Sequence, residues 1–104
     1  MSDPEDVRIL VVDDEESMRR FLSILLEKEG FQVACESSGA SALQRLENEG
    51  FDLLITDLKM PGMSGLELLQ KAQEVDPALP VIVLTAYASE ASAVEALSHG
   101  AFQY

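Results

Sequence analysis

The sequence is short of basic residues, histidine and cysteine, and each shortage argues against a class of function. The 104 residues include 7 Lys and Arg against 19 Asp and Glu, so the formal net charge is −12. We do not expect this segment to bind nucleic acid, because a phosphate backbone needs Lys and Arg to displace its counterions. Cys35 is the single cysteine and His99 the single histidine, so neither an intramolecular disulfide nor a Cys/His zinc site can form. These features favour a reducing compartment, and we expect a cytoplasmic protein.

Long apolar runs are missing as well. No stretch approaches the roughly 18 to 20 apolar residues of a membrane span, and the acidic residues 1–6 do not have the basic start of a signal peptide. The apolar share of 47% is that of an ordinary globular protein, and the length suits one domain with its own core. We therefore expect residues 1–104 to form a single domain that does not enter a membrane.

Short apolar runs alternate with amphipathic segments along the chain. The runs predict strands at 9–12, 31–35, 53–56 and 81–84, with a further strand beginning at 101. Apolar residues at helical spacing, with stops at Gly30, Gly50 and Gly100 and a cap at Ser64, predict helices that contain 18–26, 40–49, 66–72 and 90–99. Such alternation predicts a doubly wound α/β fold, a parallel sheet with helices on both faces. Because no helix follows the last strand, we expect the chain to be cut from a longer protein.

The strongest predicted strands each end on an oxygen-bearing side chain. Asp13 and Asp14 follow the first strand, Asp57 follows the third and Thr85 the fourth. The carboxyl ends of parallel strands share one edge of a sheet, where open α/β sheets bind their ligands. Three carboxylates gathered there need a cation, and ligands that are all oxygen favour Mg²⁺.

Asp57 is the best candidate for a nucleophile at this edge. A carboxylate beside a metal ion can attack a phosphoryl group, as in aspartyl-phosphate chemistry. The turn at Pro61 and Gly62 leaves room after Asp57 for backbone groups to face the site, whereas Asp13 and Asp14 lead into further acids. The hydroxyl of Thr85 could donate a hydrogen bond to a phosphoryl oxygen.

Four motifs resemble those of the receiver domain of bacterial two-component response regulators. They are V-V-D-D-E at 11–15, D-L-K-M-P-G-M-S-G at 57–65, L-T-A at 84–86 and G-A-F-Q-Y at 100–104. The resemblance covers nearly the whole chain, in order and at the right spacing. It implies a flavodoxin-like sheet with strand order 2-1-3-4-5, in which strand five is incomplete and the last helix absent.

The resemblance also implies roles for individual residues. These are the phosphoacceptor Asp57, the Mg²⁺ ligands Asp13, Asp14, Asp57 and the main-chain carbonyl of Lys59, the switch hydroxyl of Thr85 and the switch aromatic Tyr104. Asp14 would bind the ion directly and Asp13 mainly through water. The implied phosphoryl donor is a phosphohistidine on a sensor histidine kinase, selected by surface residues of the first helix such as Met18, Phe21 and Leu22.

The style of the motifs is similar to receivers at the N-terminus of σ54-dependent activators. That similarity implies an output domain C-terminal to this chain that regulates transcription, and a stand-alone receiver acting through protein–protein contacts is the alternative. The family's conserved Lys would come three positions after Tyr104, beyond this chain. Without the rest of strand five, strand 81–84 would be exposed, so we predict self-association as a homodimer or poor stability.

Other protein classes that use strand-end acids fit the sequence less well. A Mg²⁺-dependent aspartyl-phosphate phosphohydrolase needs a second Asp two residues after the first, where this chain has Lys59. A flavodoxin-like cofactor carrier needs a Gly-rich phosphate loop where this chain has the four acids 13–16. An interaction domain with a vestigial site stays open. We predict a signalling switch that catalyses its own phosphorylation and dephosphorylation, not an enzyme acting on a metabolite.

Overall fold

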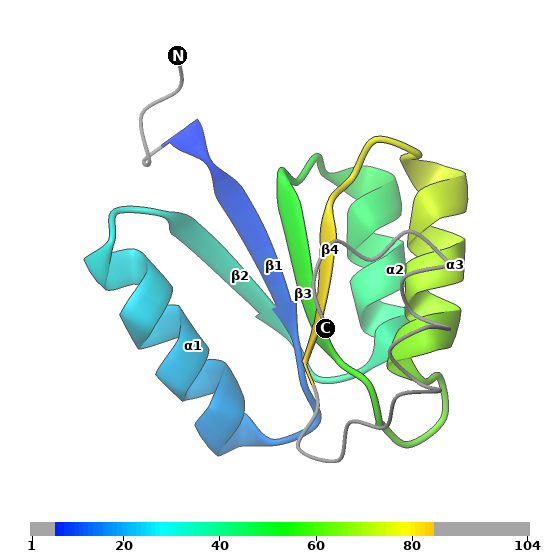
Figure 1. The fold of residues 1–104 in the computed structure, drawn as a ribbon, viewed down its shortest axis with the longest axis horizontal. Helices are drawn as coiled ribbons and strands as arrows, with labels where there is room; N and C mark the ends of the chain where they lie inside the picture. The colour runs from blue at the N-terminus through cyan, green and yellow to red at the C-terminus, as the bar shows by residue number, and fades with distance from the viewer. Residues whose placement is uncertain (1–5, 85–104) are drawn as a thin grey trace.

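The fold is a parallel β-sheet with helices on both faces. The computed structural model describes residues 6–84. In this part of the chain four strands pair in the order β2-β1-β3-β4, all parallel: β1 (Arg8–Val12), β2 (Gln32–Glu36), β3 (Leu53–Asp57) and β4 (Val81–Leu84). Three helices alternate with them: α1 (Glu16–Lys28), α2 (Gly39–Asn48) and α3 (Gly65–Val75). In Figure 1, α1 lies on one side of the sheet and α2 and α3 lie on the other.

This arrangement confirms the predicted doubly wound fold and the first four positions of the predicted strand order. The predicted helix at 90–99 and the strand beginning at 101 lie outside the described residues, as do Thr85 and Tyr104. Among residues 6–84, no helix has the length and apolar character needed to cross a lipid bilayer.

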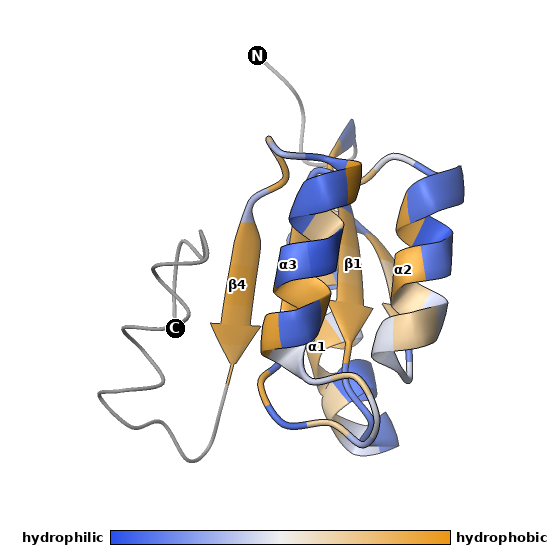
Figure 2. Ribbon diagram, turned by 90° about the vertical axis from the view of Figure 1, so that its right-hand side faces the viewer, coloured by the Kyte–Doolittle hydropathy of each residue, from blue (hydrophilic) through white to orange (hydrophobic). Residues whose placement is uncertain are grey.

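Strands β1, β3 and β4 are largely buried and their sequences are mostly apolar, whereas the edge strand β2 has no buried residue and begins and ends on polar ones. Side chains alternate along each strand, so Leu10 and Leu54 enter the core beneath α2 and α3, whereas Ile9 and Ile55 enter the core on the α1 side. In Figure 2, β4 is hydrophobic along its length and β1 is hydrophobic after Arg8, whereas α2 and α3 mix hydrophobic and hydrophilic residues. Hydrophobic strands between two helical layers hold the sheet rigidly, and its carboxyl edge with it.

Helices α2 and α3 begin at serine caps. The Ser64 side chain accepts a hydrogen bond from the backbone N–H of Glu67, and Ser38 accepts one from Ser41 in the same way. Each bond satisfies one of the N–H groups that a first helical turn leaves without a partner. Ser64 thus fixes the start of α3 at the cap that the sequence predicted. The first residue of α3, Gly65, comes eight residues after Asp57, the last residue of β3.

Helix α1 is held less firmly than its apolar residues led us to expect. It has no buried residue, and its hydrophobic contacts with the core on this side of the sheet come from Leu22 and Leu26. Phe21 keeps 60% of its surface exposed and Leu25 keeps 46%. Among the described elements, α1 packs mainly against β1 and β2, so the sheet covers part of a wider apolar stripe.

An ion-pair cluster ties β1 and β2 to α2 and to Glu49, the residue that follows it. Arg8 of β1 pairs with Glu49 at 2.7 Å, and Arg45 of α2 pairs with Glu36 at 2.9 Å and with Glu49 at 3.0 Å. The Arg8 guanidinium also lies 4.7 Å from the centre of the Phe51 ring. These pairs are partly exposed and stabilise the fold modestly.

Candidate metal site

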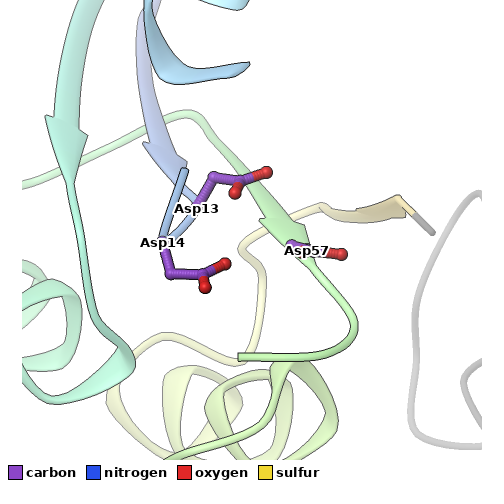
Figure 3. A group of neighbouring side chains, drawn as sticks. All are labelled: Asp13, Asp14 and Asp57. Carbon is purple, nitrogen blue, oxygen red and sulfur yellow. The ribbon is translucent and has the colours of Figure 1, made fainter. Parts of the chain in front are cut away.

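Three aspartates from two neighbouring strands meet at the carboxyl edge of the sheet. Asp13 and Asp14 directly follow β1, and Asp57 is the last residue of β3 (Figure 3). Because Val12 is in register with Thr56, the two strands end at the same level. One carboxylate oxygen from each aspartate lies within 4.8 Å of the others. The structure therefore brings together the three acids that the sequence pattern placed at this edge.

Asp13 is fixed by hydrogen bonds to its main chain and its side chain. Its N–H donates to the carbonyl of Glu36 at 3.2 Å, and its Oδ1 accepts from the N–H of Glu15 at 2.9 Å. The Arg19 guanidinium of α1 donates to the Asp13 carbonyl at 2.7 Å. Asp13 is only 6% exposed, so it enters the site from within the protein, whereas Asp14 is exposed to solvent.

Asp57 is half-buried and leads into a well-anchored main chain. The next residue, Leu58, donates its N–H to the carbonyl of Leu84 at 2.9 Å and accepts from the N–H of Gly65 at 2.9 Å. These bonds connect the end of β3 to β4 and to the first turn of α3. Lys59 follows at the exposed rim of the site, where the resemblance assigned its carbonyl to the metal.

The carboxylates of the site repel one another. Burial raises the pKa of Asp13, the nearby charges of Asp57 and Asp14 raise it further, and the hydrogen bond from Glu15 opposes them. Burial also raises the pKa of Asp57, with Asp14 and Glu15 adding to the effect and the N–H groups of Lys59 and Leu58 opposing it. Removing water from clustered negative charges is unfavourable unless a cation neutralises them.

The donor set fits a hard divalent cation. Every ligand atom that the cluster offers is a carboxylate oxygen, and Mg²⁺ and Ca²⁺ bind oxygen in preference to nitrogen or sulfur. The guanidinium of Arg19 donates its hydrogen bond to a main-chain oxygen of Asp13 and not to a carboxylate oxygen of the cluster. Asp13, Asp14 and Asp57 could therefore hold such an ion together.

Two contributors to the site were not singled out from the sequence. Arg19 anchors the Asp13 main chain and lowers the pKa of that carboxyl, and Glu15 faces Asp57 while its N–H holds Asp13. The position of Arg19 depends on how α1 leaves the strand, which spacing alone does not specify. Glu15 was visible in the sequence as one of a run of acids. The predicted switch residues Thr85 and Tyr104 lie outside the described part of the chain.

Comparison with known proteins identifies relatives of this chain. A family model for the response regulator receiver domain matches residues 9–104. The response regulator receiver protein CpdR of Brucella abortus is 48% identical over 84 residues, which cover 81% of this chain and 70% of that protein. The transcriptional regulatory protein ZraR of Klebsiella oxytoca is 42% identical over 100 residues, which cover 96% of this chain and 23% of that protein.

A solved structure extends the similarity to the fold. It is that of a response regulator protein from Burkholderia pseudomallei with a phosphorylated aspartic acid, a calcium ion and citrate. It is 35% identical and has a TM-score of 0.89, with 95% of this chain and 58% of that chain covered. The present chain spans 23% of the length of ZraR, so the similarity there concerns one part of a larger regulator. The chain belongs to the response regulator receiver family.

Proposed function

We propose that this chain is the phosphoacceptor domain of a two-component response regulator, with Asp57 as the residue that is phosphorylated. The observation that carries the proposal is the convergence of Asp13, Asp14 and Asp57, with oxygens within 4.8 Å, at the carboxyl edge of a receiver fold. Asp57 is the last residue of β3, whereas Asp13 and Asp14 follow β1. The backbone N–H groups that follow Asp57 lower the pKa of its carboxyl. The Burkholderia pseudomallei relative carries a phosphorylated aspartic acid and a calcium ion, which supports the same chemistry here.

The proposed reaction transfers a phosphoryl group from a phosphohistidine of a sensor kinase. A carboxylate oxygen of Asp57 attacks phosphorus and forms a P–O bond, while the P–N bond breaks and its electron pair stays on the imidazole. Asp13 and Asp14, with the carbonyl of Lys59, would hold Mg²⁺, which supplies positive charge for the phosphoryl oxygens. The N–H of Lys59, which lowers the pKa of Asp57, would help to orient the attacking carboxylate. Thr85 and Tyr104 are the proposed switch residues.

The exposed part of α1 is the proposed surface for the kinase. Met18 is 39% exposed and Phe21 is 60% exposed, and they lie on the helix that follows the acidic pair. Exposed apolar side chains of this kind mark surfaces that associate with other proteins. We propose that the protein acts in the cytoplasm and that its output is transcription regulation, the role named for ZraR, with a stand-alone receiver as the alternative. The coding sequence after Tyr104 distinguishes the two.

The test is the intact mass of the chain after incubation with acetyl phosphate, with and without Mg²⁺. We expect a gain of one phosphoryl group that needs Mg²⁺ and is absent in Asp57→Asn. The matched control is Asp6→Asn, an exposed aspartate at the amino end of β1, which should be phosphorylated like the unaltered chain. No gain in the folded unaltered chain, or an equal gain in Asp57→Asn, would contradict the proposal.

A further inference from the structure

The first residue of α3 packs against the main chain of the proposed phosphoacceptor. Gly65 is buried, and a Cβ built on it would lie 2.1 Å from the carbonyl oxygen of Asp57 and 2.9 Å from the Cα of Leu58. These neighbours are backbone atoms, so no side-chain rotation could make room. Positive φ values occur in the described residues at Gly30 and Gly62, but not at Gly65. A glycine is thus required at 65 for space and not for backbone conformation.

The main chain after β3 is held from several directions at this contact. Gly65 donates its N–H to the Leu58 carbonyl at 2.9 Å, and Leu58 donates to Leu84 at 2.9 Å. The fully buried hydroxyl of Thr56 donates to the Asp57 carbonyl at 3.0 Å. The carbonyl oxygen of Asp57 therefore lies between the Thr56 hydroxyl and the bare Cα of Gly65. A displacement of α3 at this point has to move the peptide units at 57 and 58.

We propose that Gly65 is a positioning residue for Asp57. Its missing side chain lets the first turn of α3 close on the end of β3, and this contact sets where the Asp57 carboxylate stands relative to Asp13 and Asp14. The main chain that follows this contact also carries the N–H of Lys59, which lowers the pKa of the Asp57 carboxyl. The inference rests on the proposed function, because it assigns Gly65 a role in the phosphoryl transfer to Asp57.

A methyl group at position 65 should disturb the site in a predictable way. The methyl carbon and the Asp57 oxygen would have to move apart by more than about 1 Å before they reached an ordinary van der Waals distance. A misplacement of about 1 Å in a reacting group costs on the order of 100-fold in rate. We expect Gly65→Ala to lower the rate of phosphorylation at saturating Mg²⁺ by about 10- to 100-fold and to raise the Mg²⁺ concentration for half-maximal rate.

The experiment compares Gly65→Ala with Gly50→Ala. Gly50 is an exposed glycine at the opposite edge of the sheet, a Cβ built on it meets nothing within 4 Å, and its φ is not positive. Rates with acetyl phosphate are measured by intact mass and divided by the folded fraction obtained from urea unfolding. Gly50→Ala should match the unaltered chain. If Gly65→Ala loses only stability, with its rate and Mg²⁺ dependence per folded molecule unchanged, the positioning role is wrong.

A second measurement on the unaltered chain decides the matter if Gly65→Ala does not fold. Saturating Mg²⁺, verified by calorimetry, should slow hydrogen exchange at the Gly65 N–H, which donates to Leu58, by about 10-fold. Exchange at the Asp52 N–H, bonded to Arg8 at the far edge, should change much less. Equal exchange of the Gly65 N–H with and without bound Mg²⁺ would overturn the inference.

Failure of the inference and failure of the proposed function give different results. If the unaltered chain gains no phosphoryl group, the proposed function is wrong and Gly65 has no phosphoryl transfer to support. If the unaltered chain is phosphorylated and Asp57→Asn is not, the function stands, and Gly65→Ala then tests the positioning role alone.

Discussion

Asp13 and Asp57 are destabilising residues at neutral pH as long as no cation binds them. Both are removed from water beside other carboxylates, and burial is the largest cause of the raised pKa of each. Stability is given up here for a site that can attract a cation, as is common where ionisable groups are gathered for chemistry.

In the presence of EDTA, the contribution of Asp57 to the free energy of unfolding should depend on pH. Because the folded-state pKa of Asp57 is raised from 3.8, the folded protein retains a proton that the unfolded chain has lost. This contribution to the free energy of unfolding is fully present below 3.8 and is lost as the pH rises through the folded-state pKa. We expect Asp57→Asn to be more stable than the unaltered chain at about pH 7, by a margin that shrinks toward about pH 4.

Urea unfolding at a series of pH values measures this margin. Asp6→Asn is the control, since this exposed aspartate removes the same charge from a place outside the acidic cluster. Equal pH profiles for Asp57→Asn and Asp6→Asn would show that the cluster is not strained by repulsion.

At the scale of elements, two helices with similar apolar patterns differ in how they are held. Leu69 of α3 is fully buried in the larger core, whereas Leu25 of α1 is 46% exposed. We expect Leu69→Ala to cost about 2 to 5 kcal/mol of unfolding free energy, the usual range for a truncated core leucine. Leu25→Ala should cost less than about 1 kcal/mol, because little packing is lost. Urea unfolding of both variants measures the difference, and similar costs would contradict the arrangement of α1 described above.

Elements were predictable from sequence where local pattern and tertiary burial agree. The strands were found because a strand covered on both faces needs apolar residues at successive positions, as at Ile9–Val12. The exposure of Phe21 and Leu25 was not found, since helical spacing tells which residues share a face but not how much of that face another element covers.

The candidate site was predictable to the same extent. The meeting of Asp13, Asp14 and Asp57 follows from the rule that parallel strands end at one edge, applied to neighbouring strands. The hydrogen bond from Arg19 and the packing of Gly65 on Asp57 depend on how helices approach the sheet. Such contacts are set by packing in three dimensions, and no residue spacing reports them.

At the scale of the whole molecule, the formal net charge of −12 opposes the compact state. Raising the KCl concentration from about 0.01 M to about 0.1 M shortens the Debye length from about 30 Å to about 10 Å and screens this repulsion. We expect an increase in unfolding free energy on the order of 1 kcal/mol, which corresponds to a rise of about 4 to 8 °C in Tm for a domain of this size. Thermal unfolding followed by circular dichroism measures it.

Choline chloride serves as the control for ion binding in the same experiment. It should act like KCl, since screening does not require an ion bound at the carboxylates. A Tm that falls with either salt would mean that attractive pairs, such as those of Arg8 and Arg45 with Glu49, outweigh the general repulsion.

The central position of β1 has a consequence for the order of events in folding. β1 meets β2 after a short connection through α1, but its pairing with β3 joins Ile9 to Leu53 across a long stretch of chain and is the slower closure. We therefore expect β1, α1 and β2 to associate before β3 docks, which would place Asp13 and Asp14 together before Asp57 joins them. The three aspartates are together only once β3 has docked. The time at which a divalent cation binds during refolding would therefore report the docking of β3.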